Sequence, residues 1–492
     1  MRRVLSLLIL ALVTLPLSAA TITSDETITY KQTEQGDLNL EIFYPNDTKK
    51  GKKRVAIISF FGGGWSSGST KHFYEQSEYY ASLGIVAITP EYRISSRHKT
   101  TPFEAVMDAK SAVRWVRQHS KELGIDPNKI IVSGGSAGGH LAACTGTIEG
   151  CDEDAVQKVS SKPNALILFN PVSKTTKDGY GSGRVVGRET EISPVHHIKR
   201  GVVPTLILHG THDTTVPYAN SVEFAEKMLE CGNECRLVSA FGENHGFFNG
   251  SLFRKSNGSR NFDKCMYETS KFLAEQGYIS EDKVMEKPDP IRVACLGNSI
   301  TFGARIENRE QDCYPANLQR LLGDDYDVKN FGRSGATLLT NGNVPYIETI
   351  PYKALQEFGP DVVIIKLGTN DSKGLNWDSH SAEFEADYKA LIAKLKSNPA
   401  RKAEVILCSP MPAFLKRETF TGDSQKMIDD SVIINHIYPI IKKLAKGNKS
   451  LFIDAYHPFV DRADLFPDKI HPGAEGAKML AELIYNCTMG KK

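Results

Sequence analysis

Two serines in this chain stand in short motifs that suit a nucleophile. Ser136 is the centre of a Gly-Gly-Ser-Ala-Gly motif at 134–138, and Ser299 ends a Gly-Asn-Ser motif at 297–299. A serine hydroxyl attacks an acyl carbon when a histidine takes its proton and a carboxylate orients that histidine. Residues of suitable types follow both motifs: Asp213 and His245 follow the first, and Gly332, Asn370, Asp468 and His471 follow the second. Two ordered sets indicate acyl-transfer chemistry at two places.

The first motif has the local context that a serine nucleophile needs. It follows a predicted strand at 130–133 and opens a helix, so Ser136 is expected at a sharp turn with small neighbours. Upstream, a Phe-Gly-Gly-Gly-Trp run at 61–65 ends another predicted strand. Backbone N–H groups without side chains can point there at a developing oxyanion. We expect that oxyanion hole to consist of the N–H groups of Gly63, Gly64 and Ala137.

Short apolar runs alternate with helical patterns from residue 55 onward. The runs predicted as buried strands are 55–60, 85–89, 130–133, 165–169 and 205–208, with a helix predicted at 103–119. Such alternation is typical of βαβ units and a mostly parallel sheet. Two earlier stretches, 27–31 and 38–43, are predicted to form an antiparallel pair. The polar, glycine-bearing stretch 174–193 is expected to form a flap over the substrate cleft.

A second alternating series begins near residue 291. The stretch 281–290 before it is polar and ends in prolines, so we interpret it as a linker between domains at 21–280 and 291–492. The second series predicts strands at 291–296, 328–331, 362–367, 405–408 and 451–453, and helices at 314–322, 382–396, 429–445 and 474–485. At 492 residues the chain is long enough for two domains with a core each. Both halves are therefore predicted to be α/β domains.

The first half, over about residues 27–276, resembles the esterase and lipase branch of the α/β-hydrolases. The order Ser136, Asp213, His245 and the strand–turn–helix context of the serine carry this resemblance. It implies that these three residues form a catalytic triad, and an inert hydrolase fold is the alternative. Members of the family usually begin the glycine loop with histidine, where this chain has Phe61. Three other histidines are expected to be structural: His140, His209 and His212.

The second half, over about residues 291–487, resembles the SGNH or GDSL-type hydrolases, which implies a flavodoxin-like fold. Four blocks in the family's order carry the resemblance: Gly-Asn-Ser at 297–299, Asn-Phe-Gly at 330–332, Gly-Thr-Asn-Asp at 368–371 and Asp-Lys-Ile-His at 468–471.

This second resemblance assigns roles by position. Ser299 is implied to be the nucleophile and His471 the general base, oriented by Asp468. The N–H of Gly332 and the side-chain amide of Asn370 are implied to complete an oxyanion hole with the serine's own N–H. The family's usual aspartate before the serine is Asn298 here, which can still accept a hydrogen bond and support the turn.

The N-terminus predicts a destination outside the cytosol. Residues 1–20 combine a basic start, an apolar stretch and small residues at 18–20, as in a cleavable signal peptide. The alternative, a signal anchor, is disfavoured because the apolar stretch is short for a membrane span. We expect a secreted or periplasmic protein without a membrane anchor. Loss of two arginines with the peptide takes the formal charge from +2 to zero, which favours neither nucleic acid nor an anionic membrane as a partner.

The nine cysteines permit disulfides in such a compartment without resembling a disulfide scaffold. Cys144 with Cys151, and Cys231 with Cys235, are close enough in sequence for local bridges. The odd total leaves at least one thiol unpaired within the chain. No cluster has the spacing of zinc ligands, so we predict no metal and no cofactor.

Both resemblances lead to families in which plant cell-wall deacetylases occur. We therefore expect a bifunctional serine esterase that removes acetyl, and also feruloyl, esters from a polysaccharide such as xylan or pectin. The alternatives are a broad carboxylesterase or lipase, and one catalytic half joined to a carbohydrate-binding half. Oligomeric state stays open. Because a neutral histidine must take the serine proton, activity is expected to rise through about pH 6 to 7.

Overall fold

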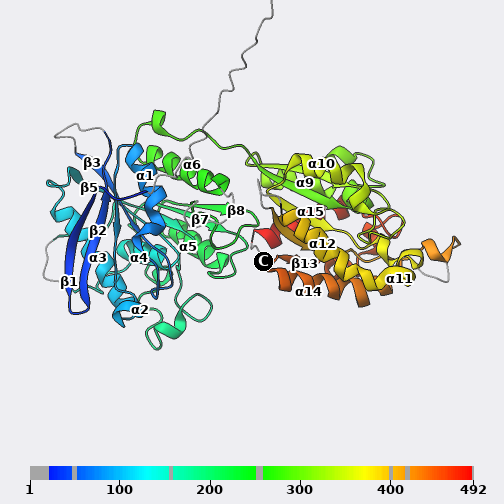
Figure 1. The fold of residues 1–492 in the computed structure, drawn as a ribbon, viewed down its shortest axis with the longest axis horizontal. Helices are drawn as coiled ribbons and strands as arrows, with labels where there is room; N and C mark the ends of the chain where they lie inside the picture. Colours follow the sequence, from blue (N-terminus) through cyan, green and yellow to red (C-terminus); the bar gives the residue numbers. More distant parts are fainter. Residues whose placement is uncertain are drawn as a thin grey trace, which may run out of the picture.

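The computed structural model describes residues 22–46, 53–153, 159–250, 259–397, 403–415 and 421–489. Each half of the chain has its own β-sheet with helices packed against it (Figure 1). The predicted fold class, an α/β-hydrolase domain followed by a flavodoxin-like domain, is confirmed. The expected signal peptide at 1–20 lies outside the described residues. Within the described ranges, no helix combines the length and the apolar character that a membrane span requires.

The first sheet has eight strands in the order β1-β2-β4-β3-β5-β6-β7-β8. The pairs β1–β2 and β2–β4 are antiparallel, which confirms the predicted antiparallel start, and the remaining neighbours are parallel. The strands are β1 (Glu26–Thr33), β2 (Gly36–Phe43), β3 (Arg54–Phe60), β4 (Val86–Pro90), β5 (Ile125–Gly135), β6 (Ala165–Phe169), β7 (Thr205–Gly210) and β8 (Cys235–Ala240). Loops after β3, β5 and β7 therefore leave the same edge of the sheet, where ligands of open α/β sheets bind.

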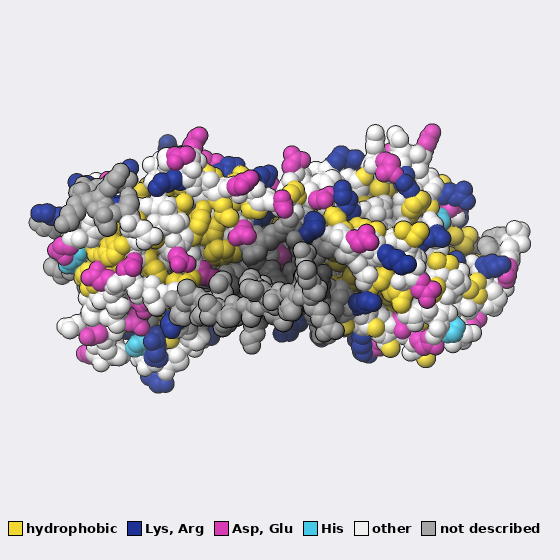
Figure 2. Space-filling model, turned by 45° about the horizontal axis from the view of Figure 1, so that its top comes forward, with side chains coloured by type: hydrophobic (Ala, Val, Ile, Leu, Met, Phe, Trp, Pro, Cys, Tyr) yellow, Lys and Arg dark blue, Asp and Glu magenta, His cyan; other side chains and the backbone are white. Residues whose placement is uncertain are grey.

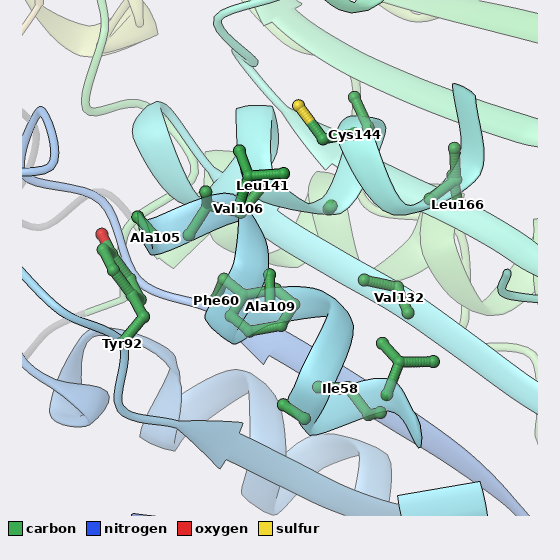
Figure 3. Packing of buried hydrophobic residues seen from close by; sticks show 14 of the residues in the cluster. Ile58, Phe60, Tyr92, Ala105, Val106, Ala109, Val132, Leu141, Cys144 and Leu166 are labelled. Carbon is green, nitrogen blue, oxygen red and sulfur yellow. The ribbon is translucent and has the colours of Figure 1, made fainter. Parts of the chain in front are cut away.

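Helices cover both faces of this first sheet (Figure 1). They are α1 (Tyr74–Ser82), α2 (Ser95–His98), α3 (Pro102–Gln118), α4 (Ala137–Thr147), α5 (Tyr218–Glu230) and α6 (Ser259–Glu275). The longest well-capped one, α3, begins with proline at its first position and a capping box between Thr101 and Glu104. Its apolar face, with Val106 and Ala109, packs with Phe60 of β3 and Leu141 of α4 (Figure 3).

The stretch 174–193, predicted as a flap, connects β6 to β7 with little regular structure. It contains one single-turn 3₁₀ helix, Ser182–Arg184, and a second, Pro194–His196, follows the stretch directly. Val185 and Ile192 of this stretch are buried in the core of the first half. We call residues 174–193 the flap segment below.

The second sheet is entirely parallel, with the order β10-β9-β11-β12-β13. That is the 2-1-3-4-5 order of doubly wound flavodoxin-like folds. Its strands are β9 (Ile291–Gly297), β10 (Tyr326–Gly332), β11 (Val362–Lys366), β12 (Glu404–Cys408) and β13 (Phe452–Ile453). Its helices of seven or more residues are α9 (Tyr314–Leu322), α10 (Ile350–Phe358), α11 (Gly374–His380), α12 (Phe384–Lys396), α14 (Tyr438–Asn448) and α15 (Ala474–Thr488).

The two halves touch each other next to the stretch predicted as a linker. Phe241, which follows β8, is fully buried in a cluster whose other members belong to the second half. Its backbone N–H donates to the Tyr326 Oη over 3.0 Å, and the two rings lie edge to face, 5.7 Å apart. Lys264 and Lys287 both pair with Asp325, at 3.6 and 2.8 Å.

The cysteines form no disulfide. All nine thiols are free, so the two local pairs that the spacing permits are not bonded, whereas the expectation of a free thiol is met. The Cys144 Sγ turns inward from α4 and lies 3.5 Å from the His140 Nε2.

Candidate active sites

The first serine lies at the sharp turn between β5 and α4. Ser136 has φ 55° and ψ −119°, a backbone conformation that side chains rarely adopt. The turn is possible because of its glycines: a Cβ on Gly138 would lie 2.0 Å from the Phe60 carbonyl oxygen. The backbone thus presents the Ser136 hydroxyl at the carboxyl edge of the sheet, where it is only 8% exposed.

Three elements bring the first set of predicted residues together. The His245 Nε2 lies 2.9 Å from the Ser136 Oγ, and the His245 Nδ1–H donates to the Asp213 Oδ2 over 2.6 Å. Asp213 follows β7 and has no exposed side-chain surface. Its Oδ1 accepts the backbone N–H groups of Thr215 and Val216. The carboxylate is therefore fixed by its own loop before it meets the histidine.

His209, which was expected to be structural, also contacts the Asp213 carboxylate. The His209 Nε2 lies 3.0 Å from the Asp213 Oδ2, and its Nδ1 lies 2.7 Å from the Ser221 Oγ. Burial alone raises the pKa of Asp213, but the hydrogen bonds from His209 and His245 outweigh it and hold that pKa well below its usual range. His209 therefore supports the ionised form of Asp213.

The predicted oxyanion loop lies directly beside Ser136. A Cβ on Gly62 would be 3.3 Å from the Ser136 Cβ, so the loop and the nucleophile are in contact. The N–H groups of Gly63 and Gly64 have no acceptor among the described residues, and Ala137 begins α4, where backbone N–H groups lack helical partners. These three predicted donors are thus available to a ligand.

Phe61 stands where the family usually has a histidine at the start of the glycine loop. A histidine from elsewhere in the chain, which the sequence did not reveal, contacts this loop instead. Phe61 stacks on Tyr92, with ring centroids 4.2 Å apart, and the Tyr92 Oη donates to the Phe61 carbonyl. The His72 Nδ1 accepts the Gly62 N–H over 3.0 Å, and its Nε2–H donates to the Asn249 Oδ1. Burial lowers the pKa of His72, which keeps it neutral and able to accept. His72 has no motif around it, so only the three-dimensional structure identifies it.

The second set of predicted residues also comes together. The His471 Nε2 lies 2.8 Å from the Ser299 Oγ, and its Nδ1–H donates to the Asp468 Oδ2 over 2.7 Å. The Asp468 Oδ1 accepts the N–H groups of Ile470 and His471. Burial raises the pKa of Asp468, yet these hydrogen bonds outweigh it and lower the pKa overall. Arg305 lies 3.6 Å from the same carboxylate on the exposed side.

Two of the three donors implied for the second oxyanion hole have partners within the protein. The Gly332 N–H donates to the Asn330 Oδ1 over 2.9 Å, which closes a tight turn at the end of β10. The Asn370 Nδ2 donates one hydrogen to the Ala336 carbonyl over 3.1 Å. The second hydrogen of this amide is left to donate to another acceptor. A Cβ on Gly332 would lie 2.2 Å from the Phe302 nitrogen, so only glycine fits beside the serine's helix.

Asn298, which stands where the family usually has aspartate, changes the hydrogen bonding before Ser299. The Asn298 Oδ1 accepts the Ile300 N–H over 3.1 Å and caps the short helix of the serine, as expected from its position. Its Nδ2 is buried and has no hydrogen-bond partner among the described residues. An aspartate there would carry a second acceptor in place of this unpaired donor.

Clusters of charged side chains would be a further kind of site. On the face shown in Figure 2, basic and acidic side chains are interspersed over both halves, without a broad area of one sign. Within the described part of the chain, no group of three histidine, cysteine, aspartate or glutamate side chains could hold a metal ion.

Known proteins match the two halves separately and together. Residues 40–173 and 185–228 match the family model described as BD-FAE, and residues 295–479 match the GDSL-like Lipase/Acylhydrolase family. The acetylxylan esterase of Xylanibacter ruminicola is 33% identical over 463 residues, which are 87% of this chain and 89% of that protein. The chain belongs to this family of two-domain esterases. It joins an α/β-hydrolase half to a GDSL-like half and is a carboxylic ester hydrolase.

Other relatives of the two-domain esterase match only part of it. Esterase LipC of Mycobacterium tuberculosis is 27% identical over 223 residues, which are 40% of this chain and 54% of that protein. Among solved structures, esterase 2 of Thermogutta terrifontis is 44% identical with a TM-score of 0.50, and the match covers 53% of this chain and 97% of that one. The first half thus has the length of a complete esterase.

Proposed function

We propose that the two-domain esterase removes acetyl groups from xylan or a similar plant cell-wall polysaccharide at two independent serine sites. One observation carries the proposal: each half holds a serine Oγ within 2.9 Å of a histidine Nε2 whose Nδ1 is hydrogen-bonded to an aspartate. The acetylxylan esterase that aligns along both halves supports the choice of substrate.

At the first site, the Ser136 Oγ attacks the acetyl carbonyl carbon while the His245 Nε2 takes the hydroxyl proton. The N–H groups of Gly63, Gly64 and Ala137 receive the carbonyl oxygen as it becomes negative. The His245 imidazolium, held by Asp213, then gives its proton to the departing sugar oxygen, which leaves an acetyl-serine. A water molecule, deprotonated by the same histidine, releases acetate and restores the serine.

The second site performs the same steps with Ser299, His471 and Asp468. Its oxyanion donors are the N–H groups of Ser299 and Gly332 and the Asn370 amide. Because the Gly332 N–H is held by the Asn330 side chain, substrate binding has to displace that carboxamide. The exchange replaces a neutral acceptor by a developing negative charge, which is the stronger hydrogen-bond acceptor.

The remaining expectations fit this proposal. A signal peptide at 1–20 directs the enzyme out of the cytosol. Its polymer substrates are found outside the cell. The two domains, at 21–280 and 291–492, act on different ester positions of one polymer: one removes acetyl groups, and the other removes acetyl groups at another position or a feruloyl ester. A shared chain raises the local concentration of the second activity on a polymer that the first has reached.

A second candidate function has a specific observation in its favour. The Gly332 N–H is occupied, and the buried Asn298 Nδ2 has no partner among the described residues; both lie beside Ser299. If the second site cannot form its oxyanion hole, that half holds carbohydrate for the first half to cleave.

Acetate and ferulate release from acetylated, feruloylated xylan tests the proposal. The enzymes compared are the unchanged chain, Ser136→Ala, Ser299→Ala and the double variant. We expect each single variant to lose a different product or fraction and the double variant to release nothing. If Ser299→Ala matches the unchanged chain and Ser136→Ala matches the double variant, the second half is a binding domain.

A further inference from the structure

The flap segment lies against the oxyanion loop of the first site. Gly181 has φ +81°, and a Cβ there would lie 2.6 Å from the Trp65 ring. The Tyr180 ring lies 5.8 Å from the same indole, between the centroids. The Trp65 Nε1–H donates to the His140 Nδ1, and the His140 Nε2–H donates to the Ile192 carbonyl over 2.6 Å. The middle and the C-terminal end of the flap segment are thus tied to the wall of the first site.

Two polar side chains of this segment converge on the glycine loop. The point where a Cβ on Gly64 would lie is 2.8 Å from the Tyr180 Oη and 3.0 Å from the Arg184 Nη1. Gly64 has φ +59°, so the backbone conformation and the lack of a side chain both leave room for these groups. A phenol and a guanidinium therefore stand beside a predicted oxyanion donor.

The guanidinium at this point has no anionic partner among the described residues, unlike two other cations of the flap segment. Lys174 pairs with Glu223 at 2.8 Å, and Arg188 pairs with Glu191 at 2.6 Å. Arg184 is exposed, whereas Ser136 is nearly buried. The unpaired charge thus faces the solvent side of the site, where a polymer chain has to lie.

The residues involved lie outside the part of the chain that the family model matches. The BD-FAE model matches 40–173 and 185–228 and leaves out 174–184, which includes both side chains. We propose that Arg184 and Tyr180 form a subsite for the carboxylate of a uronic acid on the acetylated polysaccharide. The guanidinium fork pairs with both carboxylate oxygens, and the phenol hydroxyl donates to one of them. This subsite rests on the proposed function of the first site, which it directs to acidic stretches of the polymer.

A pair of substrates that differ only in the uronic acid tests whether the first site prefers the acidic one. Acetylated xylo-oligosaccharides with and without a glucuronic acid branch are compared in the Ser299→Ala background, so that only the first site acts. Arg184→Gln is expected to lower kcat/KM on the branched substrate about ten-fold, as for loss of one charge-assisted contact, and on the neutral one less than about two-fold. The preference of the parent for the branched substrate is expected to shrink as salt is added.

The control is Lys177→Gln, which removes one exposed positive charge from the same segment and is expected to leave the preference unchanged. Equal losses on both substrates with Arg184→Gln would overturn the subsite. The subsite would also be overturned if Arg184→Gln changed only the inhibition of the enzyme by acetate, because the arginine would then bind the product.

A binding measurement separates the subsite from the proposed function. The Ser136→Ala/Ser299→Ala variant, which cleaves nothing, is titrated with the branched oligosaccharide with and without Arg184→Gln. Weaker binding by about ten-fold with Arg184→Gln supports the subsite whatever the fate of the ester. Unchanged binding overturns it, whereas a first site without activity on any acetyl ester overturns only the proposed function.

Discussion

At the scale of single residues, the two sites share one way of fixing the carboxylate. In each, one aspartate oxygen accepts backbone N–H groups of its own loop and the other accepts the histidine Nδ1–H. The histidine then has its Nε2 free to take a proton from serine. The sites differ in burial, because Asp213 is fully buried with a second histidine while Asp468 is partly exposed beside Arg305.

The second histidine at the first site supplies a prediction. His209→Leu removes the 3.0 Å hydrogen bond to Asp213 and leaves the buried charge with fewer donors. A hydrogen bond to a charged group contributes about 1.5–3 kcal/mol, so first-site kcat/KM is expected to fall about 10- to 100-fold. Hydrolysis of 4-nitrophenyl acetate in the Ser299→Ala background measures it. His212→Gln, in the loop that follows β7, is the control, and equal rates for both variants would contradict the role of His209.

His140 predicts how stability depends on pH. Burial lowers its pKa to about 4, whereas a histidine in the unfolded chain has a pKa near 6.5. Between these values the unfolded chain binds a proton that the folded chain does not, so stability falls as pH falls. From pH 7 to pH 5 the loss from this group is about 2 kcal/mol.

The test is urea unfolding of the parent and His140→Gln at both pH values. Glutamine can still accept from Trp65 and donate to Ile192, but it does not titrate. We expect the variant to lose about 2 kcal/mol less than the parent on acidification. The same loss in both proteins would show that His140 is not held neutral.

At the scale of elements, the strands that could be predicted were those with continuous apolar runs. Buried strands such as β3, β6 and β11 have every residue buried, and the sequence pattern reveals them directly. β8 was missed because it is an edge strand whose first five residues are only partly buried. Its sequence therefore lacks the apolar signal, and only its pairing with β7 makes it a strand.

The same contrast holds for the sites. Both serines follow predicted strands, whereas the order of the motifs in the two families indicated their aspartate and histidine partners. His72 holds the oxyanion loop through a contact that only the folded chain makes, and the Asn330 carboxamide occupies the Gly332 N–H in a local turn that the strand prediction did not reveal. Nothing in the spacing of Tyr180 and Arg184 indicates that they meet over Gly64.

The end of β10 supplies a prediction for the second site. In Gly332→Ala the new Cβ would lie 2.2 Å from the Phe302 nitrogen, so β10 and the serine's helix must move apart. Second-site activity, measured in the Ser136→Ala background, is expected to fall at least about ten-fold, while first-site activity, measured in the Ser299→Ala background, is retained.

Gly447→Ala is the matched control for that substitution. Gly447 lies in α14 with nothing within 4 Å of its Cβ position, so alanine is expected to stabilise the helix by about 0.4–1 kcal/mol. A second site that tolerates both substitutions equally would contradict the close approach of Gly332 to the serine's helix.

At the scale of the whole molecule, the second half supports the loop that carries His245. Phe241 is four residues before that histidine and is buried in the second half, where the Tyr326 Oη accepts its N–H. Tyr326→Phe keeps the ring and removes this acceptor, which contributes about 0.5–1.5 kcal/mol. First-site kcat is expected to fall about two- to ten-fold, although the substitution lies in the other half of the chain.

Tyr346→Phe is the comparison for this prediction. Its hydroxyl donates to the Phe331 carbonyl within the second half and makes no contact with the first half. First-site rates that fall equally in both variants, or in neither, would contradict a specific contribution of Tyr326 to the His245 loop.

The central claim, that one chain holds two independent nucleophilic serines, is tested most directly by covalent labelling. A fluorophosphonate probe reacts with serines activated by a histidine, and intact mass spectrometry counts the adducts. The account predicts two adducts on the unchanged chain, one each on Ser136→Ala and Ser299→Ala, and none on the double variant. A single adduct on the unchanged chain, lost completely with one of the two serines, would contradict it.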